Sequence, residues 1–458
     1  MSEARSVVVV GGGISGLTAA HYLRRGGVDV TVLERDAAPG GTMQTIADNG
    51  WLVETGPNSA LETTPLFNDM FESLGLVDER VYAHAAADKR YILRDGTLHP
   101  LPMSPPAFVA SSLWSVGGKL RLLKEPFVGR AREEETVAEF VERRLGREFL
   151  EYAINPFVAG VYAGDPERLS VRAAFPKLYA LEERYGGLIR GMIGGARERK
   201  KRAEKAKDRA RMFSFRRGMQ TLPRALAGSL GDRLRLQTNV TSVDRMPEGR
   251  IKVGFETREG RGEVTADAVV IAVPAYVAER FVRPYAPSLA DALEGISYPP
   301  VAQVFLGYPA AAMTRPLDGF GYLIPARERR KILGTIWSSA LFPGRAPSGH
   351  VALTTFVGGS RQPDITGRGD EELVRLVASE LASIMGVKGD PAYHKVIRWQ
   401  KAIPQYALGY LEIMNALEAL EGRVRGLHFC SNFRGGIAVG DCVMSGERIA
   451  RRIIGEGH

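Results

Sequence analysis

The chain has 458 residues, 45% hydrophobic and 25% charged, with a formal net charge of +9; this composition is ordinary for a soluble globular protein of about two or three domains. No apolar run reaches the roughly 18 to 20 residues that a membrane span needs, and the first valine run is too short for a signal peptide, so we expect a protein of the cytoplasm or of a cytoplasmic membrane face. The two cysteines, Cys430 and Cys442, are expected to be buried thiols, and the scattered histidines lack metal-ligand spacing, which argues against a disulfide framework and a metal enzyme.

The first forty residues predict a strand, a glycine turn, a helix and a second strand. The valine run of 7–10 leads into the turn, and the second strand ends at Glu34. Each turn glycine has a physical reason: Gly11 permits the tight turn, Gly13 lets the backbone approach a pyrophosphate, and Gly16 lets helix and strand pack closely. The unit therefore predicts a Rossmann-like dinucleotide site, with the phosphates at the helix N-terminus, where N–H groups and the dipole favour anions.

The acid at the tip of the second strand restricts the cofactor. Glu34 accepts hydrogen bonds from a ribose 2′-OH and repels a 2′-phosphate, which excludes NADP. FAD is favoured over NAD because residues 39–42, Pro-Gly-Gly-Thr, continue the cofactor arc and two later segments resemble FAD-contacting pieces. The alternative to a dinucleotide site is that the glycine-rich turn is purely structural and binds no cofactor. The predicted cofactor contacts of this region are Gly11, Gly12, Gly13, Ile14, Ser15, Gly16, Glu34, Arg35, Gly41 and Thr42.

Two later features are candidates for ligand contact. A turn at Gly56-Pro57 is followed by Asn58, which is either a plain turn residue or presents its amide to a flat, hydrogen-bonding ligand. Further on, a β-hairpin is expected with Asp95-Gly96 as its turn. Alternation places Arg90 and Arg94 on one face of its first strand, where they either hold a carboxylate or are simply solvated.

From about residue 105 to 196 the pattern is helical and unusually apolar for a stretch broken by prolines and glycines. Gly160 and Gly164 would admit a large ligand near the backbone. The apolar side chains are either core or an exposed face that dips into a bilayer surface. They are Phe108, Leu113, Trp114, Leu120, Leu122 and Phe127.

Most of the positive charge lies in one run, Arg197 to Arg211, which has nine Lys or Arg and three acids. It is rich in helix formers and has no aromatic residues. A solvated helix or loop and a segment attracted to anionic lipid headgroups both fit this pattern. Nucleic acid does not, because no base-stacking residues are interleaved.

The remainder of the chain alternates between strand and helix signals. A strand is expected from Leu234 to Val243, and a buried strand at 266–274 returns the chain to the first domain. Residues 286–398 predict a second, mostly antiparallel sheet with one helix from Glu371 to Met385. The closing stretch, from 426, predicts a strand, a glycine-rich loop and a final helix.

A series of motifs, in order along nearly the whole chain, carries a resemblance to a known family. They are GGGISGL at 11–17, GPN at 56–58, GVYAGDP at 160–166, RRGMQTLP at 216–223, GFGYLIP at 319–325, TTFVGGSR at 354–361, IPQYALGY at 403–410 and GGIAVGDCVMSGERIA at 435–450. The first is shared by many flavoproteins, and the later ones together are quite specific. The chain resembles the oxygen-dependent protoporphyrinogen oxidases of the amine-oxidase-like flavoprotein superfamily.

This resemblance implies an α/β fold (α+β overall) with three parts. A Rossmann-like FAD-binding domain is assembled from discontinuous segments, beside a substrate domain with a mixed or antiparallel sheet and a helical lobe that rests on a membrane. The expected segments are 1–88, 212–285 and 400–458 for the FAD-binding domain, 89–103 and 286–399 for the substrate-binding domain, and 104–211 for the lobe.

The resemblance also implies roles for residues that would otherwise pass as ordinary core. On the cofactor, Glu34 would hold the adenosine ribose, Val240 would pack near the adenine, and the flavin would be lined by Gly56, Pro57, Asn58, Trp399, Ile437, Ala438 and Val439. Arg90 would pair with a porphyrinogen propionate. The other expected substrate contacts are Asn58, Gly160, Phe320, Leu323, Ile336 and Phe356.

The implied chemistry is oxidation of protoporphyrinogen IX to protoporphyrin IX in haem biosynthesis. A hydride leaves a meso carbon for flavin N5, and reduced flavin passes its electrons to O₂, giving hydrogen peroxide. No catalytic side chain and no metal is expected, because the redox work belongs to the flavin. The implied partners are the porphyrinogen, O₂, an anionic membrane surface on the cytoplasmic face, ferrochelatase and a second copy in a homodimer; no nucleic acid is expected.

Three other interpretations remain. A coproporphyrinogen III oxidase shares the fold and the chemistry, but its substrate has four propionates and calls for more cations around the pocket. A flavin amine oxidase usually has an aromatic cage and a lysine near the flavin, which residues 433–435 do not offer. A non-catalytic porphyrin- or membrane-binding protein is opposed by the intact cofactor segments.

Overall fold

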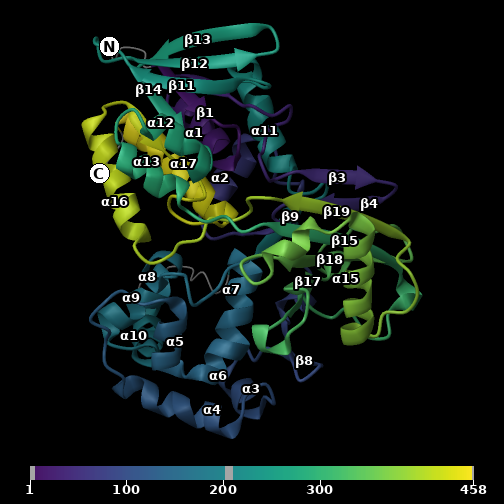
Figure 1. Cartoon of the computed structure of the whole chain (residues 1–458). Coiled ribbons are helices and arrows are strands. Elements are labelled where there is room, and N and C mark those ends of the chain that lie inside the picture. The colour runs from purple at the N-terminus through teal and green to yellow at the C-terminus, as the bar shows by residue number, and fades with distance from the viewer. Residues whose placement is uncertain (1–5, 202–209, 456–458) are drawn as a thin grey trace.

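The computed structural model describes residues 6–201 and 210–455, which form three regions that meet at a common junction (Figure 1). The first, here called the parallel-sheet region, is built on five parallel strands in the order β10-β2-β1-β14-β20. Their bounds are β1 (Ser6–Val10), β2 (Asp29–Leu33), β10 (Leu234–Arg235), β14 (Ala268–Ile271) and β20 (Leu427–Phe429). Three segments far apart in the chain thus supply one sheet, as the discontinuous pattern predicts.

The central strand β1 is buried on both faces, as expected of a parallel strand covered by helices. Val7 and Val9 pack into one hydrophobic core, and Val8 and Val10 into another. Helices on the first face are α1 (Ile14–Arg25), α2 (Leu66–Ser73), α11 (Thr221–Leu230) and α17 (Val439–Ile454). Helices on the second face are α12 (Ala275–Val282), α13 (Pro287–Glu294) and α16 (Tyr410–Arg423).

Above this sheet in Figure 1 lies an antiparallel sheet of β11 (Asn239–Arg245), β12 (Ile251–Thr257) and β13 (Gly260–Ala266). The single strand predicted from Leu234 to Val243 is wrong, because two strands of different sheets, β10 and β11, divide it. The chain breaks where Gln237 adopts a left-handed backbone conformation with φ of 52°. The backbone of Glu34 bonds to both sides of this break, to the oxygen of Arg235 and the N–H of Thr238.

The second region is a seven-stranded sheet in the order β19-β15-β18-β17-β16-β7-β8, antiparallel except where β16 runs parallel to β7. Its strands are β7 (Tyr91–Arg94), β8 (Thr97–Pro100), β15 (Val301–Pro309), β16 (Gly321–Leu323), β17 (Gly334–Ile336), β18 (His350–Gly358) and β19 (Tyr393–Trp399). The predicted hairpin and its Asp95-Gly96 turn are confirmed. Helix α15 (Asp370–Met385) covers one face through a row of buried side chains: Leu373, Val377, Leu381 and Met385.

Shorter elements lie between these strands and helices. They are β3 (Thr45–Asp48), β4 (Trp51–Glu54), β5 (Ala60–Leu61), β6 (Arg80–Tyr82), β9 (Met212–Phe215), α14 (Ser338–Leu341), η1 (Ala85–Asp88), η5 (Gly231–Arg233), η6 (Ala310–Ala312), η7 (Ala326–Glu328) and η8 (Pro363–Gly367). Strands β3 and β4 pair as a hairpin, and β9 lies between β5 and β6.

The third region, the helical lobe, occupies residues 104–201 and forms the lower left of Figure 1. It comprises α3 (Pro105–Ala110), α4 (Val116–Arg121), η2 (Leu122–Phe127), α5 (Val137–Leu145), α6 (Arg147–Phe149), η3 (Leu150–Ile154), α7 (Asn155–Tyr162), α8 (Val171–Ala174), α9 (Pro176–Tyr185) and α10 (Leu188–Lys201). Within the described residues, no helix is both long and apolar enough to cross a membrane. The central part of the basic run, 202–209, lies outside the described residues, and the exact domain boundaries stay a prediction.

Candidate active site

The glycine turn after β1 is tightly packed and forms the centre of the predicted cofactor site, here called the cofactor corner, together with Glu34, the Gly56 turn and the start of α17. A Cβ on Gly16 would clash with the backbone oxygen of Gly11, and Gly11 itself has φ of 106°, which favours glycine. Gly13, the residue before α1, is different, because a Cβ there would meet nothing within 4 Å. Ile14 and Ser15 form the first turn of α1. The turn therefore keeps open space in front of the helix N-terminus, as a bound pyrophosphate requires.

Glu34 lies beside this turn. Its side chain is buried and accepts hydrogen bonds from the backbone N–H groups of Gly12, at 2.5 Å, and Asp36, at 2.7 Å. Burial raises the pKa of the Glu34 carboxyl above its ordinary value. Arg35 is exposed and forms an ion pair with Asp36, at 3.4 Å. Val240 is buried two residues beyond Thr238, whose N–H bonds to the backbone oxygen of Glu34.

The segment Gly40 to Thr42, the second predicted cofactor contact, lies against the glycine turn after β1. The N–H of Gly40 donates to the oxygen of Gly12 at 2.8 Å, which places Gly41 opposite Gly13. Gly56 packs on the backbone of Thr42, where a Cβ would clash with the Thr42 oxygen. Pro57 and Asn58 follow, with the Asn58 amide 3.4 Å from the oxygen of Gly56.

Trp399, at the end of β19, completes this corner. Its indole N–H donates to the backbone oxygen of Thr55 at 2.7 Å, so it is fixed beside the Gly56 turn although the two lie far apart in the chain. Ile437 and Ala438 lead into α17, which begins at Val439 and packs closely on α1, since a Cβ on Gly446 would clash with the Ser15 oxygen.

Helices α1 and α17 both follow strands of the parallel sheet, so both begin at its carboxyl edge. Ligands of doubly wound sheets bind at this edge. The glycine turn, the buried acid and two helix N-termini therefore fit a dinucleotide of the flavin class. They converge there from three separate stretches of the chain: the turn that leads into α1, the end of β2 and the start of α17.

The predicted substrate wall lies on β16, β17 and β18. Leu323 pairs with Gly334, Ile336 with Gly321, and Phe356 also with Gly334, so the three side chains come from neighbouring positions of one sheet. Each is only half-buried. Phe320 precedes β16 and shares a hydrophobic cluster with Ile336. Apolar walls with remaining exposed area are what a large, flat, apolar ligand needs.

Helix α7 lies against this wall. A Cβ on Gly160 would lie 2.5 Å from Leu323 Cδ2, so any larger residue there would force the Leu323 side chain to move. The same helix face carries Phe157 and Val161, whose side chains are 42% and 40% exposed. The sequence pattern did not single out these two residues, although Gly160 and Val161 follow Phe157 at three and four positions, the spacing of one helix face.

The two hairpin arginines behave differently. The Arg90 guanidinium carbon lies 5.6 Å from the Phe320 ring centroid, and no carboxylate within the described ranges pairs with it. Arg94 instead pairs with Glu148 at 2.8 Å, donates to the oxygen of Leu113 and lies over the Tyr152 ring. Arg94 is therefore not a ligand for a carboxylate substrate, because its side chain already joins the hairpin to the lobe.

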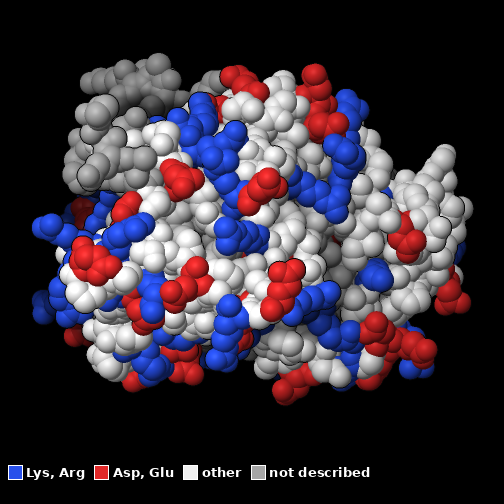
Figure 2. All heavy atoms as spheres, turned by 90° about the horizontal axis from the view of Figure 1, so that it is seen from above, with Lys and Arg blue, Asp and Glu red and all other residues white. Residues whose placement is uncertain are grey.

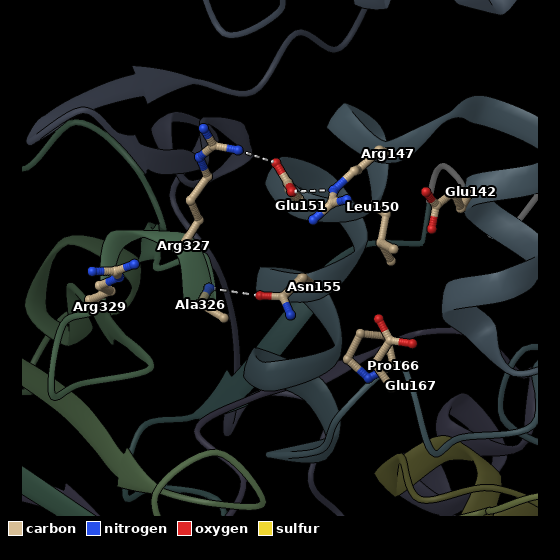
Figure 3. A pocket seen from close by; sticks show the side chains of 10 residues that line it. All are labelled: Glu142, Arg147, Leu150, Glu151, Asn155, Pro166, Glu167, Ala326, Arg327 and Arg329. Carbon is tan, nitrogen blue, oxygen red and sulfur yellow. Dashed lines mark hydrogen bonds and ion pairs between the residues drawn. The ribbon is translucent and has the colours of Figure 1, made fainter.

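A charged cavity of about 680 Å³ lies between the lobe and residues 326–329 (Figure 3). Arg327 pairs with Glu151 across it, and Arg147 pairs with the same carboxylate from one helical turn away within the lobe. Its lining includes none of the predicted substrate residues, and its charge does not suit an apolar macrocycle. The residues that line it are Glu142, Arg147, Leu150, Glu151, Asn155, Pro166, Glu167, Ala326, Arg327 and Arg329.

Asn155, at the edge of this cavity, ties α7 to the substrate wall. Its side-chain oxygen accepts from the N–H of Ala326 at 2.8 Å and from Arg361 at 3.0 Å (Figure 3 shows the first bond). Arg361 also donates to the oxygen of Ile324, next to Leu323, and burial lowers the pKa of Arg361 to about 10. These bonds hold the strand that carries Leu323 against the helix that carries Gly160.

Both cysteines are buried free thiols, as predicted. In the part of the chain that the structure describes, no three His, Cys, Asp or Glu side chains group in a way that could hold a metal ion.

Comparisons with known proteins agree with this geometry. A family model described as flavin containing amine oxidoreductase matches residues 14–454. The chain is 38% identical to the chloroplastic protoporphyrinogen oxidase of Oryza sativa subsp. japonica, over 97% of this chain and 87% of that protein. It is 28% identical to the coproporphyrinogen III oxidase of Bacillus subtilis (strain 168), over 98% of this chain and 97% of that protein.

Among solved structures, a protein assigned as a protoporphyrinogen oxidase from Exiguobacterium sp. 255-15 matches with a TM-score of 0.81 and 25% identity, covering 100% of both chains. The full-length matches include both the cofactor corner and the substrate wall. The chain therefore belongs to the flavin containing amine oxidoreductase family, within its group of protoporphyrinogen oxidases, and is a flavin-dependent oxidoreductase.

Proposed function

We propose that this chain binds FAD and oxidises protoporphyrinogen IX to protoporphyrin IX with O₂ as the electron acceptor. The observation that carries the proposal is the Arg90 guanidinium next to Phe320, at the margin of an apolar wall, where no carboxylate among the described residues pairs with it. A porphyrinogen presents the complementary pair of features, a large apolar ring system and propionate carboxylates. A related protein that bears the name of this activity is 38% identical.

The chain's own residues would bind and orient rather than react. FAD would be held by the Gly11–Gly16 turn, Glu34, the Gly56 turn and the start of α17, and when bound it would supply hydride acceptance and electron transfer to O₂. Leu323, Ile336 and Phe356 would hold the macrocycle and exclude water from it. Arg90 would fix one propionate and so set which meso carbon faces the cofactor.

Coproporphyrinogen III is the alternative substrate, because the Bacillus subtilis relative is named for it. Its four propionates need more free cations than a dicarboxylate does. Since Arg94 is bound to Glu148, Arg90 is the hairpin arginine that remains available. This difference favours protoporphyrinogen.

The test is the growth of porphyrin fluorescence in air with the two porphyrinogens offered side by side. Faster oxidation of protoporphyrinogen IX supports the proposal, and faster oxidation of coproporphyrinogen III would reassign the substrate. Arg90→Ala should raise KM by about 10-fold or more, the worth of one charge-assisted hydrogen bond, with FAD binding unchanged. Arg90→Lys, which keeps the charge, should recover part of the loss, and equal KM values in all three proteins would show that Arg90 does not bind the propionate.

We also propose that the protein lies peripherally on an anionic, cytoplasmic membrane face through its lobe. Helices α3 and α4 with η2, at the bottom of Figure 1, expose an unusual set of large apolar side chains. Leu123 is 68% and Phe127 is 84% exposed. Here the lobe's apolar face is defined as Val109, Val116, Leu120, Leu123 and Phe127.

Two details refine this membrane proposal. Of the residues suggested by the sequence, Leu113 and Trp114 are buried core, so they do not contribute to the face. Met192 and Ile193 add exposed apolar surface on α10, which packs against η2. The basic run, which begins within α10 at Arg197, would supply attraction to anionic lipid, and the ferrochelatase and homodimer partners stay predictions.

A further inference from the structure

The segment Ile403 to Tyr410, with the sequence IPQYALGY, has no role in the proposed function. It connects β19 to α16 and is here called the strap. On one side of it lies the lobe, and on the other lies the loop of residues 432–439, here called the flavin-edge loop, which ends at the start of α17. The strap is bonded to both.

Two tyrosines of the strap reach the flavin-edge loop. The hydroxyl of Tyr406 donates to the backbone oxygen of Asn432, and that of Tyr410 donates to the backbone oxygen of Phe433. The two rings stack at 4.3 Å between centroids and are only 4% and 5% exposed. Two consecutive backbone carbonyl groups thus receive hydrogen bonds from one stacked, buried pair of side chains.

The same strap holds the end of helix α7. The side-chain amide of Gln405 donates to the backbone oxygen of Tyr162 at 2.9 Å, and the N–H of Ser170 donates to the oxygen of Tyr406 at 2.8 Å. The ring of Tyr406 also packs edge-on against Tyr162, with centroids 5.9 Å apart. Tyr162 is two residues beyond Gly160, which faces the substrate wall.

Between the two tyrosine bonds and α17, the flavin-edge loop contains two glycines and Arg434. Gly435 and Gly436 have φ of 107° and 127°, conformations that other residues rarely adopt and that glycine alone does not fix. Arg434 is held by Glu421, and its oxygen accepts from Ser445 at 3.1 Å. The hydroxyls of Tyr406 and Tyr410 therefore hold the start of the loop from the strap, and Ser445 holds its next residue from α17.

We propose that Tyr406 is a positioning residue that sets the flavin-edge loop relative to α7, with Tyr410 as its support. Through Tyr406 the backbone that borders the flavin and the helix that borders the substrate share one anchor. Removing the hydroxyl frees the Asn432 carbonyl while the ring packing remains. This inference rests on the proposed function for the identity of the substrate, but not for the effect on cofactor binding.

The experiment compares Tyr406→Phe and Tyr410→Phe with Tyr285→Phe. Tyr285 donates to the backbone oxygen of Val243 on β11 at 3.0 Å and also accepts from the N–H of Arg245 at 3.0 Å, so its variant loses a tyrosine-to-carbonyl bond of the same type, and one further bond, outside the flavin-edge loop. For each apoprotein one measures FAD affinity by fluorescence quenching, then the visible absorbance of the reconstituted protein and its thermal midpoint. Anaerobic reduction by protoporphyrinogen IX is followed by stopped flow.

We expect Tyr406→Phe to raise the dissociation constant of FAD by about 5-fold, the worth of one hydrogen bond, and to shift the flavin absorbance and slow its anaerobic reduction. Tyr410→Phe should change the same quantities in the same direction. Tyr285→Phe should leave all three unchanged, whatever it does to the thermal midpoint.

A Tyr406→Phe protein with wild-type FAD affinity, absorbance and reduction rate would overturn the proposal and leave the hydroxyl a purely structural donor. If that variant does not fold, Tyr410→Phe decides the matter by the same criteria, because its bond is to the adjacent carbonyl. Wild-type protein that binds FAD but is reduced by neither porphyrinogen would overturn the proposed function alone. The affinity and absorbance changes of the tyrosine variants would still test the strap.

Discussion

The parallel-sheet region and the helical lobe have opposite arrangements of polarity. In the first, the centre is the valine strand β1, whereas the face in Figure 2, seen from the top of Figure 1, carries Lys and Arg interspersed with Asp and Glu. In the lobe, a charged cluster lies inside: the side chains of Arg144, Glu125 and Glu182 are 0%, 0% and 4% exposed. Its outside presents the apolar face that ends at Phe127.

This difference in polarity indicates that the two surfaces face different surroundings. Burial of apolar residues is the general rule in any soluble protein, so the informative features are a buried charge and an exposed apolar patch. The lobe has both, and they are connected. Glu125 lies within η2, accepts the N–H groups of Leu188 and Ile189 at the start of α10, and pairs with Arg144, so the buried cluster holds the exposed apolar segment in place.

The largest loss of stability is expected when the buried charged cluster of the lobe loses Arg144. Arg144→Met would leave the carboxylates of Glu125 and Glu182 buried without their shared cation, which should lower the free energy of unfolding by about 3–5 kcal/mol. Arg147→Met is the matched control, because Arg147 is 77% exposed and pairs with Glu151 one helical turn away. Urea unfolding followed by circular dichroism measures both. A similar midpoint for the two variants would mean that the buried cluster contributes nothing to the lobe.

The second effect comes from a looser buried pair at the border of the parallel-sheet region. Glu54 lies 3.7 Å from Arg345, and burial raises the pKa of Glu54 from 4.5 to about 7. The folded protein therefore holds a proton that the unfolded chain has lost between these two pH values. Since the native state binds more protons, stability falls as pH rises through this window, by on the order of 2–3 kcal/mol in total.

Glu54→Gln removes this titration. The difference in unfolding free energy between wild type and Glu54→Gln should move against the wild type from pH 4.5 to 7 and stay level above that. Glu72→Gln, at an exposed position on α2, serves as the control. Parallel stability curves for wild type and Glu54→Gln across this range would show that the carboxyl is not perturbed.

The third effect concerns the outside of the lobe. Burying a Leu or Phe side chain is worth about 1.5–3 kcal/mol, so Leu123→Ser and Phe127→Ser should each weaken vesicle binding roughly 10-fold without lowering stability. Val77→Ser is the control, since Val77 is also exposed, at 46%, but lies outside the lobe. Sedimentation with phosphatidylcholine vesicles, with and without phosphatidylserine, gives the affinities. Equal binding of all four proteins would place the membrane contact elsewhere or nowhere.

How much of this could be predicted from sequence differs between the two ends of the site. The cofactor corner was predictable because its requirements are local: Gly11, Gly16 and Glu34 stand at spacings that the turn itself imposes. The substrate wall was not, because Phe320 and Phe356 look like ordinary core until the sheet pairs their strands. Only the resemblance to a family singled them out.

Two errors have the same physical origin, a partner distant in sequence. Arg94 was a reasonable carboxylate ligand until Glu148, 54 residues away, was found to occupy it. The strand from Leu234 to Val243 was a good pattern, but Glu34 bonds to both sides of Gln237 and divides it. Local pattern cannot reveal either contact.

The smallest effect is expected at an exposed ion pair of the three-stranded antiparallel sheet. Arg261 is 88% exposed and pairs with Glu256 across neighbouring strands β12 and β13 at 2.8 Å. Such pairs are worth about 0–1 kcal/mol, because water and salt screen them, so Arg261→Ala should leave the thermal midpoint and vesicle binding nearly unchanged. A large loss would mean that surface charge stabilises the parallel-sheet region as buried charge stabilises the lobe. A thermal midpoint close to that of wild type for Arg261→Ala, together with a strongly destabilised Arg144→Met, would show that an ion pair stabilises this protein only where it is buried away from water.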